Sequence, residues 1–184
     1  SVLVLGASGA VGNAALQLAR AMGAGRILAG VSSAGQSEAA ADECVDLSRS
    51  PLSDTLREQV HALNGGEGVD IVIDPLGGDA FDGALRALAW RGRLVVVGFA
   101  AGRIPTLKTN YLMLRNIEVS GIQISDYRRK APELLRRAYG EIFEFLAARA
   151  IQAPPAETLE LADWQTALER VAGRQARGRQ ILVP

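Results

Sequence analysis

Cysteine and histidine are almost absent from this sequence, and their scarcity excludes two kinds of site. The chain of 184 residues has one cysteine, Cys44, and one histidine, His61. A disulfide framework needs paired cysteines, and a structural zinc site needs four ligands that are mostly Cys or His. We therefore expect no disulfide and no bound metal. Cys44 lies in a short apolar segment typical of core packing, and His61 is expected as a solvated residue at the C-terminal end of a helix, favoured there by the helix dipole.

An excess of one charge is also lacking, as are long apolar runs. Lysine plus arginine number 20 and aspartate plus glutamate number 20, so no basic surface predicts a nucleic-acid or anionic membrane partner. No apolar run approaches the ~20 residues of a membrane span, and no secretion signal precedes the first apolar run. Hydrophobic residues make up 48%, which is ordinary for a globular domain. We expect a cytoplasmic protein without a nucleic-acid or membrane partner.

Short apolar runs alternate with segments of helical period along the whole chain. Most runs are continuously apolar, which is typical of strands covered on both faces of a parallel sheet. Repeated β-α-β units predict an α/β fold with a doubly wound, mostly parallel Rossmann-type sheet and helices on both faces, formed by residues 1–184 as a single domain. The expected strands are Val2–Leu5, Arg26–Val31, Glu43–Val45, Asp70–Asp74, Arg93–Gly98, Ile117–Gln123 and Gln180–Val183.

Several residues mark the expected ends of helices. Asp79 is expected to cap one helix that ends before Gly92, Pro132 to lie in the first turn of another, and Gly173 to end the last. Residues 32–42 are few for a helical crossover between parallel strands. Either this crossover is abbreviated or residues are missing from the chain at this point.

The first twelve residues contain the motif with the most specific chemistry. An apolar strand is followed by a glycine-rich turn and the start of an amphipathic helix, with the sequence Gly-Ala-Ser-Gly-Ala-Val-Gly at positions 6–12. Small residues let the backbone approach a pyrophosphate, and the positive helix N-terminus points at that anion. We predict dinucleotide contacts from Ser8, Gly9, Ala10, Val11 and Gly12. The alternative is a tight turn with no ligand.

The end of the second expected strand bears on the choice between NAD and NADP. NAD-binding domains carry an acidic residue there for the ribose 2′-hydroxyl, whereas this chain has Ser32 and Ser33. A hydroxyl can donate to a 2′-phosphate that a carboxylate would repel. NADP(H) is therefore favoured over NAD(H), although no Lys or Arg lies between Ile27 and Leu47. Ordinary turn residues are the alternative interpretation of the two serines.

Two more glycine-bearing loops follow expected strands, at Leu76 and Gly77 and at Gly98, Phe99 and Ala100. In open α/β sheets, ligands bind beyond the carboxyl ends of the strands. We expect these five residues to border the cofactor. Phe99 is expected either beside the nicotinamide or at the edge of the core.

Two other nucleotide-binding classes do not fit the sequence. Short-chain dehydrogenases need a Tyr-x-x-x-Lys motif, but the three tyrosines are followed four places later by Arg115, Ala131 and Phe143. A P-loop needs Gly-Lys-Ser/Thr, whereas Gly12 is followed by Asn-Ala.

Five segments together resemble the zinc-independent, quinone oxidoreductase-like branch of the medium-chain dehydrogenase/reductase superfamily. They are Gly6–Gly12, Asp74–Gly78, Gly92–Gly98, Asn110–Gly121 and Gly178–Leu182. The resemblance implies hydride transfer from NADPH to a quinone or an activated carbon–carbon double bond without zinc, with Arg179 among the cofactor-binding residues. The chain departs from the family at Gln36, where a lysine often holds the 2′-phosphate, and at Leu47, where a tyrosine is common.

The same resemblance implies a partner domain. Members of the family have an N-terminal, GroES-like catalytic domain that supplies most of the pocket for the small-molecule substrate, and no segment here corresponds to it. We expect this chain alone to be inactive, and to form a homodimer through strand 117–124. The alternative is a non-catalytic NAD(P)-binding or nucleotide-sensing module.

Overall fold

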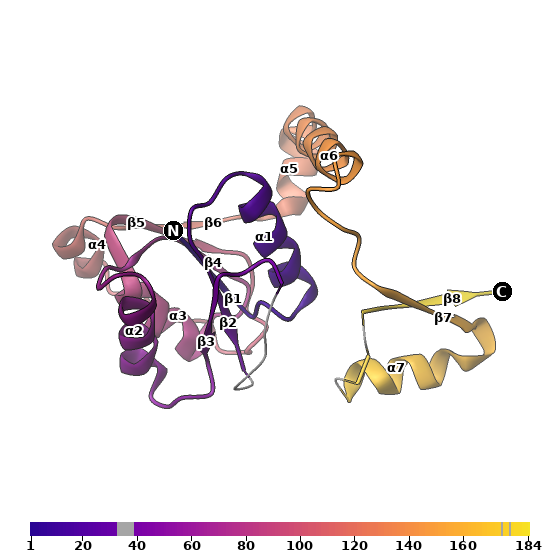
Figure 1. Ribbon diagram of the computed structural model, residues 1–184, viewed down its shortest axis with the longest axis horizontal. Helices are drawn as coiled ribbons and strands as arrows, with labels where there is room; N and C mark the ends of the chain where they lie inside the picture. Colours follow the sequence, from indigo (N-terminus) through magenta and orange to yellow (C-terminus); the bar gives the residue numbers. More distant parts are fainter. Residues whose placement is uncertain (33–38, 174, 177) are drawn as a thin grey trace. The chain divides into compact units, whose positions relative to one another are not determined.

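The computed structural model describes residues 1–32, 39–173, 175–176 and 178–184 (Figure 1). The chain forms two compact units, Ser1–Ile151 and Gln152–Pro184, which are described separately. Within the described ranges, no helix has the length and apolar character that a bilayer crossing requires.

Unit 1 is built on a six-stranded sheet in which all neighbours are parallel. The strand order is β3-β2-β1-β4-β5-β6. Successive strands run outward in one direction from β1 to β3 and in the other from β4 to β6, so the winding reverses between β1 and β4. This order confirms the doubly wound Rossmann-type sheet. The strands are β1 (Val2–Leu5), β2 (Ile27–Val31), β3 (Glu43–Asp46), β4 (Val69–Asp74), β5 (Leu88–Val96) and β6 (Glu118–Gly121).

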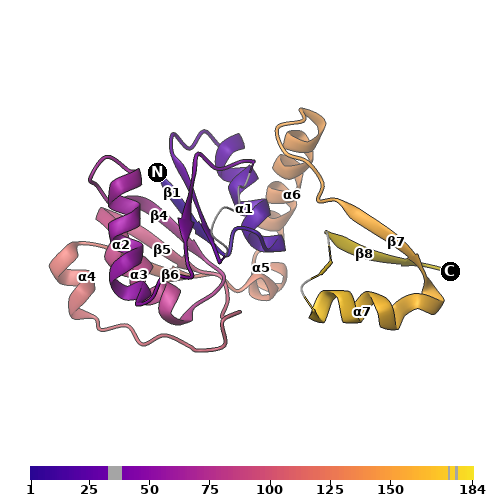
Figure 2. The same ribbon diagram turned by 60° about the horizontal axis from the view of Figure 1, so that its bottom comes forward.

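Helices cover both faces of this sheet. Figures 1 and 2 show α1 on one side and α2 with α3 on the other. The helices of unit 1 are α1 (Ala10–Ala21), α2 (Leu52–Leu63), α3 (Gly78–Ala87), α4 (Asn110–Arg115), α5 (Ile124–Lys130) and α6 (Pro132–Ala147).

The side chains of β1 show why the strands are continuously apolar. Leu3 and Leu5 belong to the core cluster beneath α2 and α3, whereas Val2 and Val4 pack with Leu16 of α1 on the opposite face. Successive side chains of a strand point to opposite faces, so a strand covered on both sides needs apolar residues at every position. All four residues of β1 are buried.

Unit 2 contains a small parallel sheet and one helix. Its elements are β7 (Ala156–Glu160), a 3₁₀ turn (Leu161–Asp163), α7 (Trp164–Ala172) and β8 (Arg179–Val183). We expected residues 180–183 to continue the main parallel series, but β8 pairs with β7, a strand that the sequence did not reveal. Strand β7 has only two apolar residues, Ala156 and Leu159, and four of its five residues are exposed.

Some of the expected helix ends are confirmed and others are wrong. Pro132 begins α6 and Gly173 is the C-terminal cap of α7, as expected. Asp79 does not cap α3, because the helix begins at Gly78 and has no side-chain cap among the described residues. Gly92 lies inside β5, which begins immediately after α3 ends. The crossover expected within 32–42 includes residues 33–38, which lie outside the described residues.

Candidate functional site

The turn between β1 and α1 brings backbone atoms unusually close together. A β-carbon at Gly12 would lie 2.2 Å from the carbonyl oxygen of Gly6 and 2.7 Å from the Cα of Ala7. Gly9 caps α1 in an extended conformation, and its N–H donates to the Gly6 carbonyl at 3.0 Å. Helix α1 therefore starts directly against the strand that precedes it, as we expected for Gly12.

The N-terminus of α1 is open to an anion. No described side chain caps it and its first turn has no acidic residue. Ser8, Gly9, Ala10 and Val11 are all exposed, with 51% of Val11 accessible. The first-turn N–H groups of a helix have no partner within the helix, and the dipole places positive potential beside them. The geometry of the turn suits a phosphate group.

Glycine contacts join the turn after β1 to the loop after β4, and the β4 loop to the loop after β5. A β-carbon on Gly6 would lie 2.9 Å from Cδ2 of Leu76, and one on Gly77 would lie 2.9 Å from Cδ1 of Phe99. The N–H of Ala100 donates to the Pro75 carbonyl at 3.1 Å. The loops predicted to border a cofactor therefore meet at the carboxyl edge of the sheet. Phe99 leaves 42% of its surface exposed there.

Asp74 holds the loop after β4 in place. Its Oδ1 accepts the N–H of Leu76 at 2.8 Å and the N–H of Gly77 at 2.9 Å. The residue is fully buried and its Oδ2 has no partner among the described residues. Burial raises the pKa of the carboxyl above its ordinary value, and the two N–H groups oppose that shift only in part. Sequence reasoning placed Asp74 in a family motif without giving it a role. The pattern that could have predicted its role is a carboxylate at the end of an apolar strand, directly before Pro-x-Gly-Gly.

Arg103 ties the loop after β5 to α3. Its guanidinium donates to Asp79 at 2.9 Å and also pairs with Asp82, while its carbonyl accepts the N–H of Gly78 at 3.0 Å. Sequence reasoning missed this arginine. The only feature of the sequence that pointed to an arginine was a pair of aspartates three residues apart on one helix face. That spacing is common on solvent-exposed helices, so it did not predict a partner.

The remaining predicted residues lie apart from the meeting point of the loops after β1, β4 and β5, or they lie outside the described residues. Ser32 is exposed and follows β2 directly, whereas Ser33 and Gln36 lie outside the described residues. Arg179 belongs to β8 of unit 2, where its N–H donates to the Pro155 carbonyl at 2.9 Å. Its contact with a cofactor stays a prediction.

The two residues with metal-binding or nucleophilic chemistry have structural surroundings. Cys44 is half-buried and packs against the cluster beneath α1, which confirms the core interpretation. His61 lies in the last turn of α2 as expected, but it is not freely solvated, because its Nε2 is buried without a partner in the described part of the chain. Among the described residues, no group of three or more His, Cys, Asp and Glu side chains is placed to hold a metal ion.

A family model described as zinc-binding dehydrogenase matches residues 10–139. The chain belongs to this family. It is a quinone oxidoreductase-like member of the medium-chain dehydrogenase/reductase superfamily and corresponds to the nucleotide-binding domain, which confirms the resemblance drawn from the five segments.

Individual relatives agree with this assignment. The chain is 33% identical over 182 residues to quinone oxidoreductase-like protein 2 of Bos taurus, covering 99% of this chain and 52% of that protein. It matches the Escherichia coli quinone oxidoreductase complexed with NADPH with a TM-score of 0.81 and 27% identity, over 100% of this chain and 56% of that one. It is also 28% identical to part of a highly reducing polyketide synthase of Cordyceps militaris, covering 98% of this chain and 7% of the synthase. The chain thus spans about half the length of the oxidoreductases it matches.

Proposed function

We propose that this chain is the NADP(H)-binding part of an oxidoreductase that transfers hydride to a quinone or an activated carbon–carbon double bond. The observation that carries the proposal is the meeting of three loops beside the open N-terminus of α1, in a fold whose relative from Escherichia coli was solved with NADPH. Because one relative is part of a polyketide synthase, the proposal includes activated double bonds as well as quinones among the possible hydride acceptors.

The residues at this edge fit a dinucleotide. The backbone amides of positions 10–12 are the donors for a pyrophosphate, since the first-turn N–H groups of α1 have no partner within the helix and no described side chain caps them. Ser32 is an exposed residue directly after β2, and in this proposal its hydroxyl donates to the 2′-phosphate on the adenosine ribose. Leu76, Gly77 and Phe99 form the wall toward the nicotinamide. When bound, the nicotinamide supplies the hydride, and the chain's own residues orient it.

Three further features belong to the same proposal. A GroES-like domain outside this chain supplies most of the substrate pocket, and hydride transfer proceeds without zinc, which agrees with the single cysteine and single histidine. The active protein is a cytoplasmic homodimer joined through the predicted strand 117–124, within which the strand is β6 (Glu118–Gly121) and Ile124 begins α5. Strand β6 is the last in the sheet, so its outer edge can pair with the same strand of a second copy.

Titration with NADPH and NADH tests the cofactor assignment directly. We expect NADPH to quench tryptophan fluorescence or raise the melting temperature saturably, and to bind more tightly than NADH. Gly12→Ala should lose this response. Tighter binding of NADH would overturn the NADP assignment, and no response to either nucleotide at millimolar concentration would overturn dinucleotide binding. Light scattering after size-exclusion chromatography tests the dimer, and a strict monomer at micromolar concentration contradicts pairing through β6.

A further inference from the structure

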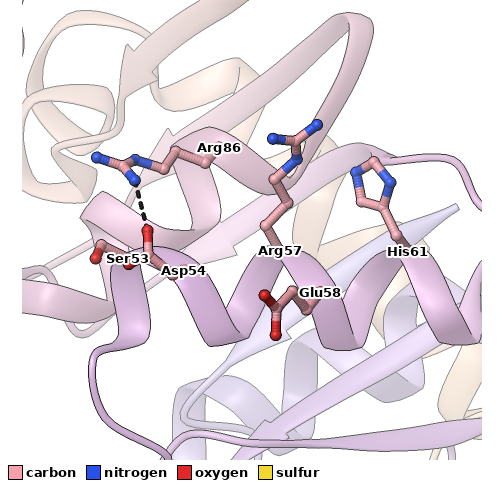
Figure 3. A pocket seen from close by; sticks show the side chains of 6 residues that line it. All are labelled: Ser53, Asp54, Arg57, Glu58, His61 and Arg86. Atoms are coloured by element: carbon pink, nitrogen blue, oxygen red, sulfur yellow. Dashed lines mark hydrogen bonds and ion pairs between the residues drawn. The ribbon is translucent and has the colours of Figure 1, made fainter.

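A cavity of about 430 Å³ lies beside α2 and α3, away from the loops assigned to the dinucleotide (Figure 3). Arg86 pairs there with Asp54 at 2.8 Å, and Arg57 and Glu58 complete the charged part of the lining. Two carboxylates therefore offset two guanidiniums, so the lining has no excess charge with which to select an ion. Asp74, at the carboxyl end of β4, is a more informative polar group.

Among the residues that the structure describes, Asp74 is the only one with a charged or polar side chain in the buried core. It faces the same side of the sheet as Val72, which belongs to the apolar cluster beneath α2 and α3. A buried carboxyl lowers stability unless its hydrogen bonds compensate, and its Oδ2 has no partner among the described residues. An apolar side chain would suit the packing better, so the carboxyl is better explained by what its other oxygen holds.

Asp74 is bonded to two loops at once. Its Oδ1 accepts the N–H groups of Leu76 and Gly77, at 2.8 and 2.9 Å. Its main-chain carbonyl accepts the N–H of Val97 at 2.8 Å and that of Gly98 at 3.3 Å. The side-chain bonds hold Gly77 at a φ of +67° and a ψ of −146°, a conformation close to a region that is essentially restricted to glycine. Such a backbone persists only where its surroundings determine it, and Asp74 supplies that restraint.

Both loops lie on one side of the point where the winding of the sheet reverses. The order β3-β2-β1-β4-β5-β6 places the ends of β4 and β5 on the opposite side of β1 from the end of β2. A dinucleotide in such a sheet lies across the reversal, with one nucleotide on each half. In the proposed function Ser32, after β2, takes the adenosine half, so the loops after β4 and β5 take the nicotinamide half. Phe99 packs on that half, since a β-carbon at Gly77 would lie 2.9 Å from its Cδ1.

We propose that Asp74 is a positioning residue for the nicotinamide half of the dinucleotide, acting through the loops after β4 and β5 without touching the nucleotide. The inference rests on the dinucleotide-binding function proposed above. Without the carboxyl, the N–H groups of Leu76 and Gly77 lose their acceptor, and the wall that they form with Phe99 loses its fixed position. Among the described residues, none of the bonds of Asp74 reaches Ser32, so the adenosine half keeps its affinity.

Calorimetric titration with two ligands separates the two halves. NADPH is compared with adenosine 2′,5′-bisphosphate, which has the adenosine half without the nicotinamide. Asp74→Ala should weaken NADPH binding about tenfold, because a displaced wall misplaces the ring, and should change binding of the bisphosphate less than about twofold. Asp74→Asn keeps a carbonyl oxygen that accepts both N–H groups, so it should restore the affinity for NADPH to within about threefold of that of the unmodified chain.

Val72→Ala is the matched control. Val72 is as deeply buried on β4, and its truncation leaves a cavity without removing a hydrogen-bond acceptor. It should leave both affinities unchanged at a temperature where circular dichroism shows the chain folded. Equal losses for the two ligands, equal losses in Asp74→Ala and Val72→Ala, or no rescue by Asp74→Asn would each overturn the positioning role.

A measurement on the unmodified chain keeps the test decisive if Asp74→Ala does not fold. The backbone amide NMR signals of Leu76 and Gly77 should shift with NADPH and stay in place with the bisphosphate. Signals that do not respond to NADPH would place the nicotinamide elsewhere and overturn the proposal. A chain that binds neither ligand contradicts the dinucleotide-binding function itself, whereas unchanged NADPH binding by Asp74→Ala contradicts only the role of Asp74.

Discussion

The Oδ1 atom of Asp74 accepts the N–H of Gly77 at 2.9 Å, and this bond holds a loop of the candidate site in a conformation with a φ of +67° at Gly77. The same oxygen accepts the N–H of Leu76. One buried carboxyl therefore sets the backbone that packs against Gly6 on one side and Phe99 on the other.

Asp74 should make stability depend on pH in an unusual direction. Because burial raises its pKa in the folded state, its contribution is fully present below the unfolded pKa and is lost as the pH rises through the folded pKa. Asp74→Asn removes this titration. Urea unfolding from pH 3 upward should therefore show the difference in unfolding free energy moving in favour of the Asn variant as the pH rises. A constant difference across the range would show that the carboxyl does not titrate as inferred.

Gly12→Ala should destabilise the chain and abolish nucleotide binding together. The new methyl group meets backbone atoms of Gly6 and Ala7, which cannot rotate away, so we expect a loss of about 1–3 kcal/mol or more. Thermal unfolding with and without NADPH measures both effects.

Gly140→Ala is the matched control for that substitution. Gly140 lies within α6 and a β-carbon there meets nothing within 4 Å. Alanine has the higher helix propensity, so we expect a gain of about 0.5–1 kcal/mol and unchanged NADPH binding. Destabilisation of similar size in both variants would contradict the special role of the β1–α1 turn.

Arg103→Ala should weaken NADPH binding several-fold without unfolding the chain. The substitution releases the loop carrying Phe99 from Asp79 and Asp82, while the core stays intact. Isothermal titration calorimetry measures the change in affinity. Arg93→Ala breaks a comparably exposed ion pair with Glu118 and is the control. Equal effects of the two variants would count against Arg103 as a positioning residue.

Ser32→Asp should shift the preference from NADPH toward NADH. A carboxylate at the end of β2 repels a 2′-phosphate and accepts a hydrogen bond from a 2′-hydroxyl, so the affinity ratio should change by about tenfold or more, equivalent to about 1.4 kcal/mol. Parallel titrations of both nucleotides measure this ratio. Ser125→Asp adds the same charge on exposed α5 and should leave the ratio unchanged.

The main sheet was predictable because its strands have a strong local signal. Each of β1 and β2 is apolar at nearly every position and all their residues are buried. Strand β7 was missed because two of the five residues in Ala-Glu-Thr-Leu-Glu are charged and most are exposed, so its apolar content did not distinguish it from a loop. The end of the helix expected just before Gly92 was misplaced for a related reason, because α3 ends at Ala87 and β5 begins at Leu88. Leucine suits a helix face and a strand equally, and pairing with Val69 decided the strand.

The candidate site divides in the same way. By itself the sequence determined the glycine turn at 6–12 and the mostly parallel, doubly wound sheet implied by repeated β-α-β units, because glycine spacing and apolar runs act within a few residues. Only the tertiary structure decided that Asp74 ties down its own loop, that Arg103 reaches Asp79, and that the Nε2 of His61 is buried without a partner among the residues described. Those relationships depend on which elements pack together and on which side chains lose contact with water. A short stretch of sequence predicts neither the packing partners nor the loss of water.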